Sequence, residues 1–252
     1  MKQVTLVAFY GQKRGDLEKL IKECWKLIDK SKFRKVFEPY HINQVHGTIV
    51  GMGKLIGFDN LFNANSWQSS GDKKIMDYNN FISTVKSYLP IKIRFGGFDE
   101  SYESFKSFGK SPYERSFQIQ RPTSRVTLIG WPYDDKNFTE KRILCDLRQD
   151  IETKCKIKHK YPDDNDFFMV LGEIKGIQLL TDSEITSLET ESRLLEESIR
   201  KYLENNPIDV DITDEQVFLV QYDKETLPLD STNAYCIQNA GIDVNFIQNL
   251  YR

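Results

Sequence analysis

The sequence is poor in the residues that build metal centres and covalent cross-links. Its 252 residues include three histidines and four cysteines, and the scattered cysteines form no CxxC pair. A structural zinc site needs about four such ligands at short spacing, so the composition argues against one. Reduced thiols are expected, and we expect neither a metal nor a cofactor.

Long apolar runs are also missing. No run approaches the roughly 18 residues of a membrane helix. The first residues, MKQVTLVAFYGQKRGD, offer only about eight apolar-rich positions before charges begin, which is too few for a signal peptide. We therefore expect a cytoplasmic protein that does not contact a membrane.

The chain has little net charge and no nucleotide-binding glycine motif. A formal charge of −2 gives no general attraction to nucleic acid, so an anionic ligand would need a local basic cluster. The absence of a P-loop or a dinucleotide fingerprint argues against an ATPase or a Rossmann enzyme.

What is present suits one large globular domain. Apolar residues make up 39% and charged residues 29% of the chain, as in folded proteins. Periodicity predicts strands over 3–10, 45–51, 91–98, 115–120, 125–131, 167–174 and 216–223, and helices over 17–30, 77–89, 138–154 and 182–204. Residues 53–76 are expected to form a long loop.

The order of these segments favours a particular architecture. Strand, helix and strand follow one another twice, with further strands between. We expect an α+β fold with two related lobes, about 1–90 and 91–252, of mostly antiparallel sheet with helices on the outer faces and a central cleft.

The stretch VHGTIVG, residues 45–51, carries the most suggestive chemistry. His46 and Thr48 are two residues apart, so in a strand they project from one face about 6–7 Å apart. A histidine can act as acid or base, and a threonine hydroxyl can hold a phosphate oxygen. Gly47 and Gly51 leave room above the backbone. The alternative is a structural histidine that binds a neighbouring loop, next to an ordinary strand threonine.

This context, TLVAFY, a helix, a return and then His46-Gly47-Thr48-Ile49, resembles the first lobe of the 2H phosphoesterase superfamily, which includes bacterial RNA 2′,3′-cyclic phosphodiesterases. The resemblance extends loosely over most of the chain, through IKIRFGGF, RVTLIGW and QVFLVQYDKETLP. It implies two lobes that each present a His-x-Thr/Ser pair to a shared cleft. One histidine would act as base and the other as acid on a phosphodiester, without metal.

The second His-x-Thr pair of that family is not found. By element order it belongs in FFMVLGEI, where Phe168 and Val170 occupy its positions, and we prefer this alignment because it keeps the helix between the strands. The other candidate is Arg125-Val126-Thr127, which has the threonine but replaces the histidine with arginine. His159 lies in the basic segment KCKIKHK outside the strand.

Three further residues are predicted to contact a substrate phosphate. Tyr113 and Arg115 stand at the entrance of a strand in YERSFQIQ, and Arg125 begins RVTLIGW. An arginine can hold phosphate through two hydrogen bonds but cannot act as an acid near neutral pH.

The sequence thus predicts a divergent 2H phosphoesterase-like protein that hydrolyses a cyclic phosphate or an RNA-type phosphodiester, with His46 as acid or base. The alternative is a catalytically inactive relative that binds a nucleotide, an RNA end or a protein partner.

Overall fold

The computed structural model describes residues 2–120, 123–134, 136–137, 139–175 and 182–252. Its helices are α1 (Gly15–Asp29), α2 (Ala64–Ser70), α3 (Phe81–Tyr88), α4 (Pro112–Ser116), α5 (Ile143–Cys155), α6 (Asp182–Asn205) and α7 (Val244–Asn249). Its strands are β1 (Gln3–Ala8), β2 (Phe37–Pro39), β3 (Gly47–Gly51), β4 (Ile91–Phe95), β5 (Phe117–Gln120), β6 (Arg125–Asp134), β7 (Thr139–Glu140), β8 (Phe167–Ile174), β9 (Ile208–Ile212), β10 (Val217–Tyr222) and β11 (Asn233–Cys236).

One antiparallel sheet organises the described residues. Its main strand order is β11-β10-β1-β3-β8-β6-β4-β9, and β2, β5 and β7 pair at its sides. The order is balanced about the β3–β8 pair, because β1–α1–β3 lies on one side and β6–α5–β8 on the other. The predicted α+β class and the repeated strand, helix and strand order are therefore confirmed, whereas two lobes around a cleft stay a prediction.

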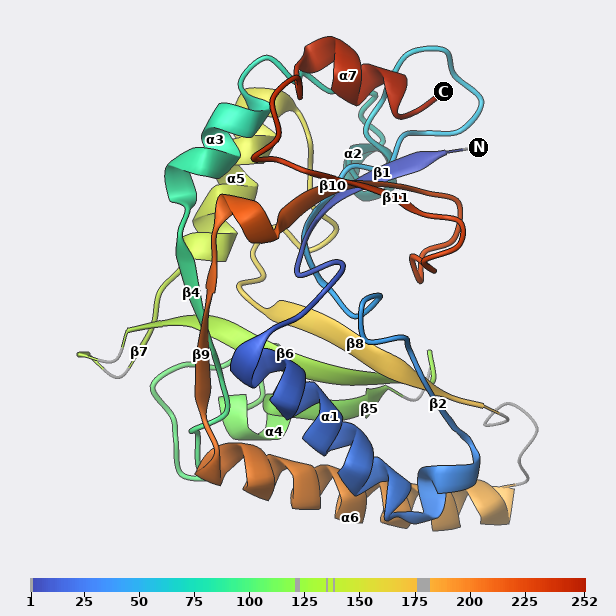
Figure 1. Ribbon diagram of the computed structural model, residues 1–252, viewed down its shortest axis with the longest axis vertical. Coiled ribbons are helices and arrows are strands. Elements are labelled where there is room, and N and C mark those ends of the chain that lie inside the picture. The colour runs from blue at the N-terminus through green and yellow to red at the C-terminus, as the bar shows by residue number, and fades with distance from the viewer. Residues whose placement is uncertain (1, 121–122, 135, 138, 176–181) are drawn as a thin grey trace.

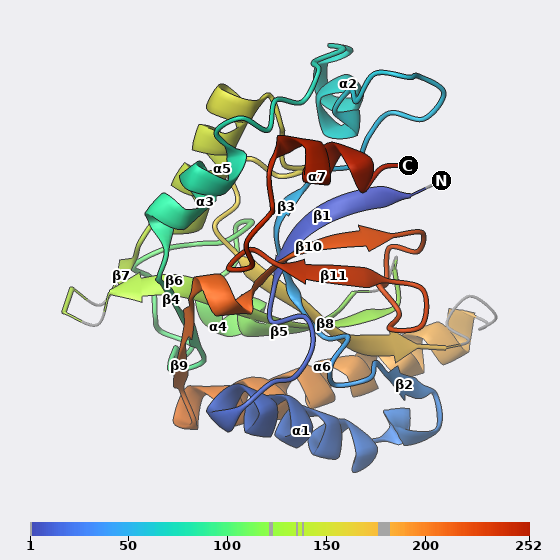
Figure 2. The same cartoon turned by 45° about the horizontal axis from the view of Figure 1, so that its top comes forward.

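The helices cover the sheet in two groups. α1 and α6 run side by side beneath β5, β6 and β8, and α3 lies against α5 beyond β4 (Figures 1 and 2). α1 is held by an apolar stripe at helical spacing, made of Leu17, Leu20, Ile21, Cys24 and Ile28, all buried.

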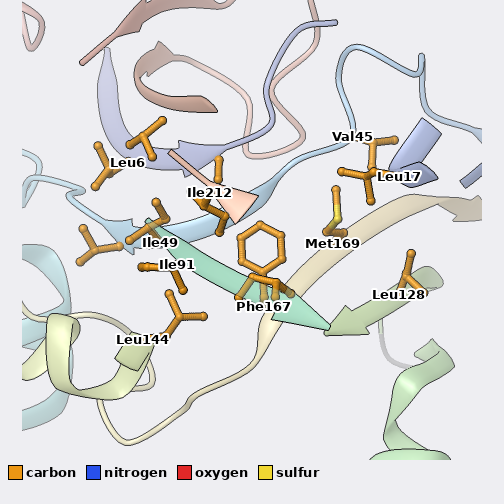
Figure 3. Packing of buried hydrophobic residues seen from close by; sticks show 14 of the residues in the cluster. Leu6, Leu17, Val45, Ile49, Ile91, Leu128, Leu144, Phe167, Met169 and Ile212 are labelled. Carbon is orange, nitrogen blue, oxygen red and sulfur yellow. The ribbon is translucent and has the colours of Figure 1, made fainter. Parts of the chain in front are cut away.

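The main core lies under the β3–β8 pair, and Phe167 is at its centre. Ile49, Ile91 and Met169 surround its ring (Figure 3). The ring fills the space that a side chain at position 47 would need, since a Cβ on Gly47 would lie 2.2 Å from Cζ of Phe167. The room that this glycine creates is thus on the core side of β3, away from His46.

Several predicted segments match the structure closely. The strand 167–174 is β8, and 115–120 with 125–131 form the antiparallel pair of β5 and β6. The predicted close backbone approach at Gly96–Gly97 is confirmed, because Gly96 has φ +74° and its Cβ would lie 2.2 Å from the carbonyl oxygen of Leu203. The expected loop 53–76 contains α2, which Asn63 caps by accepting from the Ser66 backbone N–H.

The chain ends meet on the same side of the molecule. β10 pairs with β1 from Gln3↔Tyr222 to Ala8↔Val217, and Nε2 of Gln221 donates to the carbonyl of Leu250 after α7. No helix in the described part of the chain is long and apolar enough to cross a membrane.

Candidate active site

The pairing of β3 with β8 sorts the central residues between two faces. Gly47 pairs with Met169, and paired residues in an antiparallel sheet share a face. Met169 belongs to the main core, so alternation puts Thr48, Phe168 and Val170 on the opposite face. His46, which directly precedes β3, is on that opposite face too and touches Tyr10 there.

Both positions proposed for the second motif lie on this face. Val170 pairs with Thr127 of β6, so Phe168, Val170 and Thr127 face the same way as Thr48. Thr127 is fully buried, and its hydroxyl donates to the carbonyl of Gln118. The neighbouring strands thus present apolar or already bonded side chains beside the first motif.

The His46 ring is fixed by a backbone hydrogen bond. Nδ1 lies 2.6 Å from the carbonyl oxygen of Gln44, and because a carbonyl can only accept, Nδ1 carries the proton. The neutral ring therefore keeps an unprotonated Nε2. Burial lowers the pKa of His46 to about 4; the Gln44 carbonyl opposes this shift and the charge of Lys13 adds to it.

Thr48 is half-buried and free to bind a ligand through its side chain. Its backbone pairs with Val7, and its carbonyl accepts from Nη2 of Arg148 at 3.2 Å. Within the described part of the chain, no hydrogen bond engages the Thr48 hydroxyl.

Arg148 of α5 fixes β3 from the core side. Its guanidinium is 2% exposed and donates to four carbonyls: Thr48 and Ile49 on β3, and Asp164 and Asp166 before β8. This arginine therefore joins the two central strands directly behind the His46 motif.

Lys13 is a member of the site that the sequence did not reveal. Its residue is 3% exposed, and its Nζ donates to the carbonyl of Gly11 at 3.0 Å. Burial lowers its pKa to about 7, and among the described residues no carboxylate lies within ion-pair distance of it. In the sequence it stands in the polar turn GQKRGD, where a lysine is ordinarily exposed.

The loop between β10 and β11 packs over the same face. The Tyr10 hydroxyl donates to the carbonyl of Leu227 at 3.1 Å, and Nε2 of Gln44 donates to the carbonyl of Thr226 at 2.7 Å. Farther along the loop, the hydroxyls of Ser231 and Thr232 are buried and have no hydrogen-bond partner. Thr232 lies beside Tyr10 and acts on its pKa.

Arg125 reaches this loop as well. It begins β6 opposite Glu173, and its Nη2 lies 3.6 Å from Oε2 of Glu225. Its side chain is about one-third exposed. The structure thus brings Arg125 to the loop that packs over Tyr10, and its contact with substrate stays a prediction.

Arg115 and Tyr113 are held elsewhere. Nη2 of Arg115 lies 3.0 Å from Oδ2 of Asp166, and its guanidinium covers the ring of Phe108. Tyr113 is buried and donates to Glu197 of α6. No contact in the described structure joins either residue to His46, and their substrate role stays a prediction.

His159 does not supply a second acid or base. It is buried, and its Nδ1 accepts from the backbone N–H of Gly51 at 3.3 Å. Burial lowers its pKa well below the usual value, and the charge of Arg148 adds to this shift. His159 therefore supports β3 as a neutral structural residue.

Two further observations concern other parts of the surface. A pocket of about 370 Å³ opens before β8, and its lining includes Glu140, Arg142 and Asp164 but not His46. Burial raises the pKa of Asp164 to about 6, and Asp166 adds to the shift. No group of three or more metal-ligating side chains is found in the described part of the chain.

Comparison with known proteins identifies no family. No family model matches the chain, and no curated protein matches it. A solved structure, a conserved protein of unknown function from Agrobacterium tumefaciens, is similar at 9% identity and a TM-score of 0.46, over 94% of this chain and 86% of that one. Similarity at this level carries no functional inference.

Proposed function

We propose that the protein is a divergent, metal-independent phosphoesterase of the 2H type, which hydrolyses a cyclic phosphate or an RNA-type phosphodiester. The observation that carries the proposal is the fixed imidazole of His46. Its Nδ1 is bound by the Gln44 carbonyl, its Nε2 is left unprotonated, and Thr48 projects from the same face.

The geometry suits His46 to the role of base. A neutral Nε2 can take the proton of an attacking water, and the Thr48 hydroxyl can donate to a phosphate oxygen. A pKa of about 4 makes the free imidazole a weak base. A bound phosphate would raise that pKa, because a negative charge favours the imidazolium that forms during the reaction.

The second candidate is a phosphate-binding protein without turnover. It is favoured by Phe168 and Val170, which lie beside His46 on the neighbouring strand and cannot move a proton. In this alternative the same face binds a nucleotide or an RNA end, and Thr48 and His46 act as ligands only.

Hydrolysis assays decide between the two. The protein, His46→Ala and the exposed-histidine control His41→Ala are incubated in EDTA with 2′,3′-cyclic nucleotides, cyclic-phosphate-ended RNA and short 2′-5′ and 3′-5′ oligonucleotides. We expect turnover that falls by about 10²–10⁴-fold in His46→Ala, the usual size of general acid–base assistance, and persists in His41→Ala.

Other outcomes have equally definite meanings. Binding of a nucleotide that depends on His46, without turnover of any substrate, supports the binding protein. If neither turnover nor binding is measured, both functions are wrong.

A further inference from the structure

Lys13 lies next to His46 through a short chain of contacts. The backbone N–H of Gly11 donates to the carbonyl of Asn43 at 2.7 Å, and Nζ of Lys13 donates to the carbonyl of that same glycine. The Tyr10 ring packs edge-on to the ring of His46 at 5.9 Å. The turn after β1 is thus tied to the segment that enters β3.

The surroundings of Lys13 lack a negative charge. A buried ammonium is costly unless an anion or several hydrogen bonds balance it. In the described structure Lys13 makes one hydrogen bond, and the only charge that acts on His46 is that of Lys13 itself. The buried hydroxyl of Thr232 beside Tyr10 is also unpartnered. An anion is the ligand that would satisfy these groups together.

We propose that Lys13 takes the place of the missing second histidine: its ammonium binds the substrate phosphate and protonates the leaving oxygen. This inference rests on the proposed phosphoesterase function and adds a residue that the family pattern does not include. Phe168 and Val170 leave the acid position on β8 empty of chemistry, and Lys13 approaches His46 from the other side, beyond β1.

The step balances without a metal or a co-reactant. Water loses a proton to Nε2 of His46 as its oxygen bonds to phosphorus. The bond from phosphorus to the ribose oxygen breaks, and that oxygen takes a proton from Nζ of Lys13. The products are a phosphate monoester and a free hydroxyl, and solvent returns the proton from His46 to Lys13.

The pH dependence supports this division of roles. With a pKa of about 4, His46 becomes available as a base above pH 4. With a pKa of about 7, Lys13 remains an acid below pH 7. The titratable groups around them are Tyr10, on which Asp230 acts, and the Arg125–Glu225 pair of the covering loop. The rate should therefore rise through pH 4 and fall through pH 7.

The test compares Lys13→Met and Lys13→Arg with the control Lys19→Met, whose lysine is exposed on α1. One substrate is a 2′,3′-cyclic nucleotide, whose leaving oxygen needs a proton; the other is bis(4-nitrophenyl) phosphate, whose leaving group does not. We expect Lys13→Met to lower kcat/KM on the cyclic nucleotide by about 10²-fold or more and on the aryl ester by much less. Lys13→Arg should restore phosphate binding but not the fall in rate above pH 7, because arginine does not lose its proton there.

Each outcome bears on one of the two proposals. An active protein whose Lys13→Met variant is folded by circular dichroism and keeps full activity overturns the role of Lys13 and leaves the phosphoesterase standing. If the wild-type protein turns over no substrate, the phosphoesterase and proton donation are both wrong. Titration with inorganic phosphate then decides the anion site: we expect Lys13→Met to weaken binding by about tenfold or more, and unchanged binding overturns the site.

Discussion

Two basic side chains, Lys13 and His46, are buried near one another with no carboxylate to neutralise them. Folding therefore favours their neutral forms, and this preference links stability to pH. For Lys13 the pKa falls from 10.5 in the unfolded chain to about 7 in the fold. Between these values the unfolded chain binds more protons than the folded protein, so this group makes the protein more stable as pH rises.

The first prediction concerns this linkage. Between pH 7 and pH 9, the free energy of unfolding of the wild-type protein should rise relative to that of Lys13→Met, by up to about 1.4 kcal/mol per pH unit. Urea denaturation of both proteins at several pH values measures the difference. A difference that does not change with pH would mean that Lys13 is not buried as an amine.

The second prediction concerns Thr48. Since no described hydrogen bond uses its hydroxyl, Thr48→Val should leave the unfolding midpoint nearly unchanged while it lowers kcat/KM by about tenfold or more, the loss of one hydrogen bond to a charged phosphate. Thr48→Ser keeps the hydroxyl and should retain most of the activity. Equal losses in the two variants would assign the effect to packing by the threonine methyl group.

At the scale of elements, α5 supports the site through Arg148. Its guanidinium donates to carbonyls of β3 and of the segment before β8. A helix that packs on a sheet usually does so through apolar side chains, whereas here a buried charge is balanced by backbone dipoles. The backbone of Thr48 is thus positioned from behind by a residue far away in sequence.

The third prediction tests this support. Arg148→Met should lower the free energy of unfolding by about 3 kcal/mol or more, since each buried carbonyl left without a donor costs about 1–3 kcal/mol. The control Arg142→Met removes an arginine that is 59% exposed on the neighbouring turn and should change stability little. Thermal unfolding by circular dichroism compares the two. Equal stability of the two variants would show that water replaces the guanidinium.

Much of the sheet could be predicted from the sequence because apolar strands and amphipathic helices have distinct periods. β8 was predictable as a continuous apolar run, and the close approach at Gly96 from its pair of glycines. α2 was not, since ANSWQSS has no apolar stripe and depends on the Asn63 cap. The candidate site was predictable only at His46 and Thr48. The burial of Lys13 arises from contacts between the β1 turn and the segment before β3, which no local pattern encodes.

At the scale of the whole molecule, one sheet and one main core join the N-terminal and C-terminal parts. β3 meets β8 at the centre, and β10 returns to β1. The main core includes residues from α1, α3, α5 and α6 together. The regions 1–90 and 91–252 therefore share their packing instead of each enclosing a separate core.

The fourth prediction follows from this shared core. Unfolding by urea should be a single transition with the same midpoint by far-ultraviolet circular dichroism and by tryptophan fluorescence. Trp25 lies on α1 and Trp131 on β6, so the fluorescence reports on both regions; Trp67→Phe removes the exposed tryptophan of α2. Two separated transitions would contradict one cooperative unit and indicate lobes that fold independently.

The place of β1 in the sheet has a consequence for the order of synthesis. This strand is made first, yet one of its neighbours is β10, more than two hundred residues later. A growing chain thus carries the apolar strand QVTLVA with one edge unpaired until almost the whole protein has left the ribosome. Exposed strand edges of this kind invite aggregation. Newly made chains should therefore depend on chaperones late in translation, and the face that carries His46 would be completed last.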